Sequence, residues 1–311
     1  FLLTFTSTTW GQSYDTSWVG HFSYLDIKEV VYGDTKFYAA SDNAIFSYDP
    51  LSNQLSTIST INGLSGELIS TIHYSNQYQL LLIGYENGLI EVYKESTQEL
   101  LKVVDVINKT TIPSSQKKIN HFNEIDSVVY IATDYGISVY DLDDLEFGDT
   151  YYIGANGSQV NVNQTTVFNN EIYAACGSNM GIKKASLSNP NLIDFQFWST
   201  LIIGNFTEIT SFGTQLYTLN SSNRIFEING INFNPLFTYP QTVVDLKVSE
   251  NTLLATTASK VYQYTPGFNV MDIYTTNLGF ETGFTSALTI DNVIYIGTTD
   301  FGVLKSTATS T

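Results

Sequence analysis

Residues 27–49 read IKEVVYGDTKFYAASDNAIFSYD, three short apolar segments joined by turn-forming residues. Tyr38 lies in the second segment, with Ile27 eleven positions before it and Ile45 seven positions after it. The alternation Ile-Phe-Ser-Tyr that begins at Ile45 is typical of a β-strand whose two faces have unlike surroundings. The link Asp42-Asn43 suits a tight hairpin, because Asn tolerates a positive φ. This stretch therefore predicts three strands connected by tight turns.

The same arrangement recurs seven times, at intervals of about 43 residues, and this period is the signature of propeller blades built from short strands. The positions equivalent to Tyr38 are Leu82, Tyr130, Tyr173, Tyr217, Leu254 and Tyr295. Each is preceded by an apolar residue, in order Ile27, Ile69, Ile119, Val162, Phe206, Val243 and Phe284. Each is followed by another, in order Ile45, Ile90, Ile137, Ile182, Ile225, Val261 and Val303. The sequence predicts an all-β, seven-bladed β-propeller.

Small side chains recur two residues after the central position of each copy. They are Ala40, Gly84, Ala132, Ala175 and Gly297, with Leu219 and Thr256 as exceptions. Blades taper toward the axis of a propeller, so we expect these residues where neighbouring sheets crowd together.

The two ends of the chain suggest how the ring closes. The seventh copy lacks a fourth strand and ends in a run of Ser and Thr, whereas residues 17–24 are strand-like and precede the first copy. We expect residues 17–24 to supply the missing outer strand and remove an exposed sheet edge. Residues 1–11 are apolar and then small, which is typical of the remnant of a secretory signal peptide. The prediction is one domain, residues 12–311, outside the cytoplasm.

Charge and composition exclude several classes of partner. The formal net charge is −17, from 30 acidic and 13 basic residues, and Arg224 is the single arginine. Nucleic acid and anionic membrane surfaces would be repelled, because their binding requires a basic footprint. A mean hydropathy of −0.01 indicates a globular chain rather than one with membrane spans. The acidity is explained most simply by solubility.

No residue pattern indicates catalysis, a metal site or a cofactor. Cys176 is the single cysteine, so no intrachain disulfide exists, and its strand-like surroundings favour a buried, inert thiol. The histidines, His21, His73 and His121, lie apart without metal-ligand spacing. Known nucleophile, zinc-hydrolase and phosphate-binding motifs are absent from the sequence. We therefore expect a protein that is not an enzyme.

Four stretches resemble the first propeller of the PorZ family, a surface component of the type IX secretion system. They are TINGLSG at 60–66, LIGYENG at 82–88, TDYGISVYD at 133–141 and TDFGVLK at 299–305. The resemblance implies a non-catalytic role at the outer membrane beside a sortase-like signal peptidase, supporting attachment of lipopolysaccharide to secreted cargo. It also implies a second propeller and a β-sandwich, which this chain does not contain.

Two other readings stay open. An Asn-Gly-Leu-Ser element such as residues 62–65 also occurs in the glycan-sensing propellers of hybrid two-component receptors. A polysaccharide-degrading enzyme would require two carboxylates facing one pocket. For residues 62–65 themselves we predict a structural role, in which Asn62 and Gly63 form a tight turn and Leu64 packs between blades.

A candidate surface for a ligand or partner lies on the links between second and third strands. In a propeller these links share a face with the connections between blades, around the axis. Aromatic rings could stack on sugars while carboxylates accept hydroxyl protons, so a neutral glycan or a protein loop would fit. The alternative is that these residues form turns and pack the rim. The candidates are Tyr85, Glu86, Asp134, Tyr135, Asp300 and Phe301.

Overall fold

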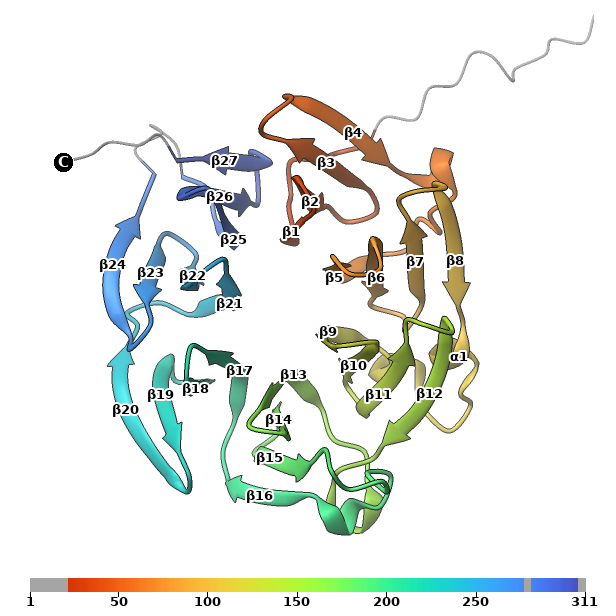
Figure 1. The fold of residues 1–311 in the computed structure, drawn as a ribbon, viewed down its shortest axis with the longest axis vertical. Coiled ribbons are helices and arrows are strands. Elements are labelled where there is room, and N and C mark those ends of the chain that lie inside the picture. Colours follow the sequence, from red (N-terminus) through yellow and green to blue (C-terminus); the bar gives the residue numbers. More distant parts are fainter. Residues whose placement is uncertain (1–21, 277–280, 307–311) are drawn as a thin grey trace, which may run out of the picture.

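The computed structural model describes residues 22–276 and 281–306, and in these ranges the strands form seven antiparallel sheets arranged in a ring (Figure 1). The innermost strands are β1 (Glu29–Gly33), β5 (Ile69–Ser75), β9 (Ile119–Ile125), β13 (Val162–Phe168), β17 (Phe206–Phe212), β21 (Val243–Ser249) and β25 (Phe284–Ile290). The second strands are β2 (Lys36–Ala40), β6 (Leu80–Tyr85), β10 (Val128–Thr133), β14 (Glu171–Cys176), β18 (Gln215–Asn220), β22 (Thr252–Thr257) and β26 (Val293–Thr298). The predicted seven-bladed propeller is confirmed.

The third strands of the blades are β3 (Ile45–Asp49), β7 (Ile90–Lys94), β11 (Gly136–Asp141), β15 (Gly181–Ser186), β19 (Arg224–Asn229), β23 (Val261–Thr265) and β27 (Val303–Lys305). The outer strands are β4 (Gln54–Ile58), β8 (Glu99–Val103), β12 (Glu146–Tyr151), β16 (Ser199–Ile202), β20 (Asn232–Thr238) and β24 (Asn269–Tyr274). Helical turns are short: α1 (Asp105–Asn108) and the 3₁₀ turns η1 (Thr60–Asn62), η2 (Ser114–Gln116), η3 (Ala155–Gly157) and η4 (Phe195–Phe197). No helix in the described ranges has the length and apolar character needed to cross a membrane.

The hydrophobic core is divided among the interfaces between neighbouring blades. One cluster joins blades 1 and 2 through Tyr38, Ile45 and Ile72, and a further cluster joins each following pair. The last of these joins blade 7 to blade 1, where Leu288 and Tyr295 pack with Ile27, so apolar burial closes the ring. Each blade buries both faces against its neighbours, which explains why the second strands are almost entirely apolar.

Close approach of the blades explains the recurring small residues. A Cβ added to Gly84 would lie 2.6 Å from Cγ2 of Ile119, which belongs to the next blade. At the end of the ring, a Cβ added to Gly297 would lie 2.7 Å from Cγ2 of Ile27. Both contacts are shorter than atoms tolerate, so the expectation of crowding at these two positions is confirmed.

The outer strand predicted from residues 17–24 lies mostly outside the described residues. Residues 22–28, which are described, form no strand. Blade 7 has three strands in the described ranges, β25 to β27. The chain before β1 nevertheless contacts this blade: Ile27 N donates to Thr298 O (2.8 Å) and Leu25 O accepts from Gly302 N (2.8 Å). Main-chain hydrogen bonds and the Ile27 cluster therefore join the first and last blades.

The structural role predicted for residues 62–65 is confirmed. Ser59 and Asn62 form a capping box around η1, and Gly63 follows with a φ of 105°, which a residue with a side chain rarely adopts. Leu64 is 4% exposed and packs in the core between blades 1 and 2. The element fixes the connection between those blades.

Candidate functional site

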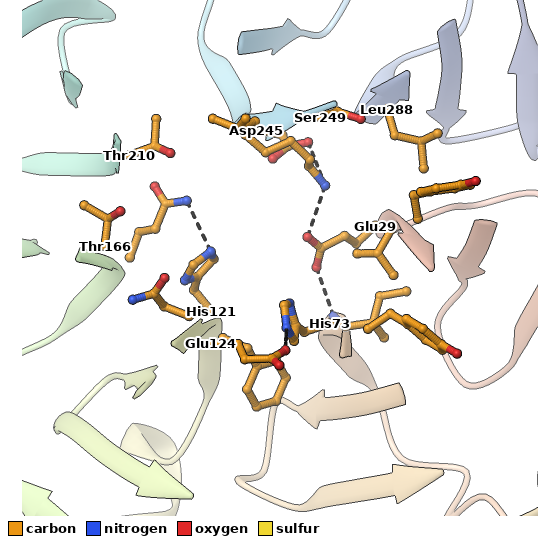
Figure 2. Close-up of a pocket in the computed structure, with 18 of the residues that line it drawn as sticks. Glu29, His73, His121, Glu124, Thr166, Thr210, Asp245, Ser249 and Leu288 are labelled. Atoms are coloured by element: carbon orange, nitrogen blue, oxygen red, sulfur yellow. Dashed lines mark hydrogen bonds and ion pairs between the residues drawn. The ribbon is translucent and has the colours of Figure 1, made fainter. Parts of the chain in front are cut away.

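The innermost strands converge on the axis, where they enclose two cavities of about 470 and 280 Å³. We call these the larger and the smaller axial cavity, and Figure 2 shows the larger. The two cavities share the lining residues Glu29, His121, Gln164 and Asp245. The walls are mainly polar, in contrast to the apolar interfaces between blades, so the axis offers hydrogen-bonding groups rather than a hydrophobic slot.

A ring of polar side chains surrounds the axis at the level shared by the two cavities. Its members stand two residues after the recurring apolar residue that opens each copy, one in each blade. We call them the polar ring: Glu29, Thr71, His121, Gln164, Glu208, Asp245 and Ser286.

A β-bulge at the start of the innermost strands places these side chains. In blade 2, Ile69 is opposite Tyr85 but Thr71 is opposite Gly84, so one residue of the strand is left without a partner. The same shift occurs between Val162 and Gln164 in blade 4. Because two residues then face one, the polar side chain turns to the other face of the strand.

Four members of the polar ring accept a main-chain N–H from the innermost strand of the next blade. Glu29 Oε2 accepts from Ile72 N (3.0 Å) and Gln164 Oε1 accepts from Ile209 N (2.7 Å). The other two bonds run from Ala287 N to Asp245 Oδ2 (3.4 Å) and from Val30 N to Ser286 Oγ (3.3 Å). These four side chains satisfy buried donors and connect neighbouring blades, which is a structural task.

Lys247 places one ammonium group at the wall, beneath the ring. Its Nζ donates to Ser286 Oγ (2.8 Å) and Val30 O (3.0 Å), and it lies 3.2 Å from both Glu29 Oε1 and Asp245 Oδ2. Figure 2 shows Glu29 and Asp245 approaching one another from different blades. Two carboxylates, a hydroxyl and a carbonyl therefore coordinate this cation.

The pKa directions follow from burial and from these charges. Burial opposes the charged form of Lys247, but Asp245 and Glu29 outweigh burial and raise its pKa. Burial favours the neutral form of Glu29, yet the Lys247 ammonium and donated hydrogen bonds leave its pKa lowered. For Asp245, burial dominates and raises the pKa in spite of Lys247. A single ammonium thus only partly compensates the acidic wall.

The two histidines of the described chain both reach the axis but have different partners. Gln164 Nε2 donates to His121 Nε2 (3.3 Å), which places the His121 proton on Nδ1, and burial lowers the pKa of this imidazole to about 4. His73 Nε2 lies 2.7 Å from Glu124 Oε2, and Ser75 Oγ donates to the other oxygen of Glu124 (2.7 Å). No group of three or more metal-binding side chains occurs among the described residues, and His21 lies outside them.

Glu208 is the exception in the polar ring. It lines the smaller cavity, and no described residue donates a hydrogen bond to its carboxyl group. Burial and the neighbouring charges of Asp245 and Glu29 raise its pKa well above the usual range, against the opposing effect of Lys247. Its neighbour Gln164, at the same level in blade 4, is fully hydrogen-bonded.

The structure separates the residues of the predicted ligand face into two groups. Tyr85 is 1% exposed, with its hydroxyl donating to Glu91, and Tyr135 is 0% exposed, with its hydroxyl 2.7 Å from Ser138 Oγ. Neither ring offers a face to a ligand, so the expectation that both could stack on a sugar needs correction. Each phenol packs into the blade because a hydroxyl partner is available inside it.

The other four candidates lie at the surface or at the edge of the smaller cavity. Glu86 forms an ion pair with Lys118 (2.9 Å), and Asp134 accepts from Asn120 Nδ2 (2.9 Å). Lys118 and Asn120 both line the smaller cavity. In blade 7, Asp300 is exposed and accepts from Thr299 Oγ1 (2.6 Å), while Phe301 is 40% exposed. Glu86 and Asp134 thus contact residues that line the smaller cavity. The role of all four candidates in binding stays a prediction.

The buried thiol agrees with expectation. Cys176 is fully buried in the core between blades 3 and 4, and burial raises the pKa of its thiol to about 12. The protonated thiol is therefore a poor nucleophile at neutral pH.

Comparison with known families places this architecture. The model of the family described as "TSS9, PorZ, N-terminal beta-propeller domain" matches residues 37–199, more than half of the chain. The chain belongs to this family. The match runs from blade 1 to blade 4, and a search of curated proteins gives no match.

Solved structures share the fold at low sequence identity. PorZ of Porphyromonas gingivalis, an essential surface component of its type IX secretion system, is 17% identical with a TM-score of 0.74. The alignment covers 91% of this chain and 37% of PorZ, so the chain spans little more than a third of that protein. The extracellular domain of a hybrid two-component system from B. thetaiotaomicron is 17% identical, with a TM-score of 0.66 over 90% of this chain and 40% of that one. The designed protein Ika8 is 12% identical, with a TM-score of 0.59 over 91% and 96% of the two chains.

Proposed function

We propose that this chain is a non-catalytic binding propeller of a type IX secretion system complex outside the cytoplasm. In that complex it would contact other surface proteins, including the sortase-like signal peptidase, and support attachment of lipopolysaccharide to secreted cargo. The observation that carries the proposal is the family match over residues 37–199. The likeness to PorZ across 91% of the chain supports it.

The face that borders the smaller cavity is the proposed contact surface. It would include the exposed residues Glu86 of blade 2 and Asp300 and Phe301 of blade 7, together with the partly buried Asp134 of blade 3. Exposed carboxylates with an aromatic ring suit a protein loop or a neutral glycan. An anionic polysaccharide would meet repulsion at this face and would bind better elsewhere in a larger assembly.

A gene replacement in the bacterium that encodes the chain tests the proposal. The variant carries Glu86→Ala, Asp300→Ala and Phe301→Ala together, and the matched control carries Leu55→Ala and Val270→Ala on outer strands, each 61% exposed. We expect the first variant, but not the control, to release cargo into the medium and to lose co-purification with the signal peptidase. Cargo retention by both variants would overturn the proposed surface.

A sensor role is the second candidate, because the extracellular domain of a hybrid two-component system has the same fold over 90% of the chain. A sensor propeller predicts that deleting the gene abolishes a transcriptional response to a polysaccharide and leaves cargo attachment intact. Transcript profiling of the deletion strain on different glycans, measured beside cargo retention, separates the two functions.

A further inference from the structure

We propose that the smaller axial cavity binds a primary ammonium group, held between Glu208 and Asp245. The ligand is either a small amine or a lysine side chain of a partner polypeptide. The inference goes beyond the proposed function, because it concerns a site inside the propeller and not the secretion complex. It rests on the cavity, on the hydrogen bonds of the polar ring and on the charges that face Glu208.

Equivalent positions in the other blades show which hydrogen bonds Glu208 lacks. In blades 1, 4, 6 and 7 the ring side chain accepts an N–H from the next blade. Glu208 occupies the same position in blade 5, yet its carboxyl group receives no hydrogen bond from any described residue and faces a cavity of about 280 Å³. It is therefore free to meet a ligand, unlike the ring carboxylates that join blades.

The same ring already shows how it coordinates an ammonium group. Lys247 Nζ is surrounded by Glu29, Asp245, a serine hydroxyl and a main-chain carbonyl at 2.8 to 3.2 Å. Glu208 and Asp245 come from the adjacent innermost strands β17 and β21, and both line the smaller cavity. A second ammonium group there would find two carboxylates of the same kind.

The charges around the smaller cavity leave a place for a cation. The acidic groups that face Glu208 are Asp245 and Glu29. The Lys247 ammonium group also acts on Glu208, but it already forms ion pairs with Asp245 and Glu29. Lys28 and Lys118 also line the cavity, but they form ion pairs with Asp26, Asp42 and Glu86 at its mouth. His121, on the facing strand β9, has a pKa lowered to about 4 by burial and is neutral at neutral pH.

Binding should displace a proton. Burial, Asp245 and Glu29 raise the pKa of the Glu208 carboxyl and so favour its protonated form, whereas an ammonium group in the cavity would favour its charged form. Affinity for the amine should then rise with pH as Glu208 loses its proton, as long as the amine stays charged. A neutral hydroxyl ligand would not show this dependence.

Isothermal titration of the 311-residue chain tests the proposal. The probes are 1,4-diaminobutane, a Gly-Ser peptide with one lysine, and 1,4-butanediol, in phosphate and in Hepes buffers. We expect one of the two amine probes to bind with release of a proton and butanediol not to bind. Binding of the diamine alone identifies a small amine, and binding of the peptide identifies a lysine side chain.

The decisive variant is Glu208→Gln, which keeps the shape of the side chain and removes its charge. We expect it to weaken amine binding about tenfold or more and to abolish proton release. The matched control, Glu99→Gln, lies on the outer strand β8 and should bind as the unmodified chain does. Absence of amine binding at millimolar concentration, equal binding of butanediol, or unchanged binding by Glu208→Gln would each overturn the inference. The buffer dependence of the unmodified chain gives an answer even if the variant does not fold, and cargo retention is scored separately.

Discussion

Glu91 and Glu208 are two carboxyl groups inside the same propeller, and their surroundings differ sharply. Glu91 is 0% exposed between blades 1 and 2, where one oxygen accepts from the Tyr85 hydroxyl and from Ser65 N (3.3 Å). Its other oxygen lies 3.5 Å from Lys102 Nζ. Glu208 lines a cavity and receives no hydrogen bond from the described residues. The first carboxylate holds a loop in place, whereas the second is available for binding.

The contrast shows that a buried polar side chain can have a structural role on the face of the propeller and a binding role at its axis. On the face, Glu91 and Leu64 fix the Asn62–Ser65 loop by hydrogen bonding and apolar packing. On the axis, some ring side chains connect blades and one does not. Burial of a polar residue is a sign of binding only where its hydrogen bonds are incomplete.

The largest expected effect is on the structural side of this comparison. Leu64→Ala should lower the free energy of unfolding by about 2–4 kcal/mol, because it opens a cavity in the core between blades 1 and 2. Urea unfolding followed by tryptophan fluorescence measures the change. Ile61→Ala is the control in the same loop: its side chain is 71% exposed, so a change within about 0.5 kcal/mol is expected. Equal effects of the two variants would refute the packing role of Leu64.

The next effect distinguishes a ring side chain that joins blades from one that does not. Gln164→Ala leaves Ile209 N without an acceptor and should cost about 1–3 kcal/mol. Glu208→Ala removes the equivalent side chain one blade later, where no N–H depends on it, and should cost less. The comparison is made by urea unfolding at pH 7. A larger loss from Glu208→Ala would mean that Glu208 also has a structural role.

A smaller effect, of opposite sign, is expected on the free energy of unfolding when Glu208 is replaced by an uncharged residue. A carboxyl group with a raised pKa in the folded state stabilises that state below its unfolded pKa, and this contribution is lost as the pH rises through the folded pKa. Glu208→Gln should therefore stabilise the protein at pH 7 and have little effect below the ordinary pKa of a glutamate, about 4.3. Thermal unfolding at both pH values provides the measurement, with Glu99→Gln as the control. A destabilised Glu208→Gln at pH 7 would contradict the absence of partners.

The fold could be predicted from the sequence because apolar residues recur at equivalent positions of every copy of the repeat. Tyr38 and its equivalents fall in the second strand of every blade, and the glycines at 84 and 297 lie where a neighbouring blade leaves no room. Within the described ranges, the apolar cluster that contains Leu288 and Ile27 joins the last blade to the first. Two flanking apolar positions per copy were sufficient for this prediction.

The axial site could not be predicted by the same reasoning, because a bulge changes the phase of the innermost strands. A strict period of two puts Ile69 and Thr71 on one face, whereas they pair with the adjacent residues Tyr85 and Gly84 and so face opposite ways. A signal was nevertheless present: the residue two positions after the opening apolar residue is polar in all seven copies. Tyr85 and Tyr135 were misplaced because no sequence pattern reveals that Glu91 and Ser138 receive their hydroxyls.

The smallest effect expected here concerns His121, which belongs to the ring but is neutral. Its pKa is lowered by burial from 6.5 to about 4, so the folded state resists a proton that the unfolded chain accepts. Stability is then fully present above about pH 6.5 and is lost as the pH falls toward 4. His121→Gln should remove this contribution, which amounts to less than about 1 kcal/mol between pH 7 and pH 6. Urea unfolding at these two pH values gives the difference, and His73→Gln is the matched control that retains the His121 contribution. Resonances of the His121 ring should titrate near pH 4 in the unmodified chain. A midpoint near 6.5 would show that water or a charged partner reaches the imidazole. His121 would then be as accessible as Glu208.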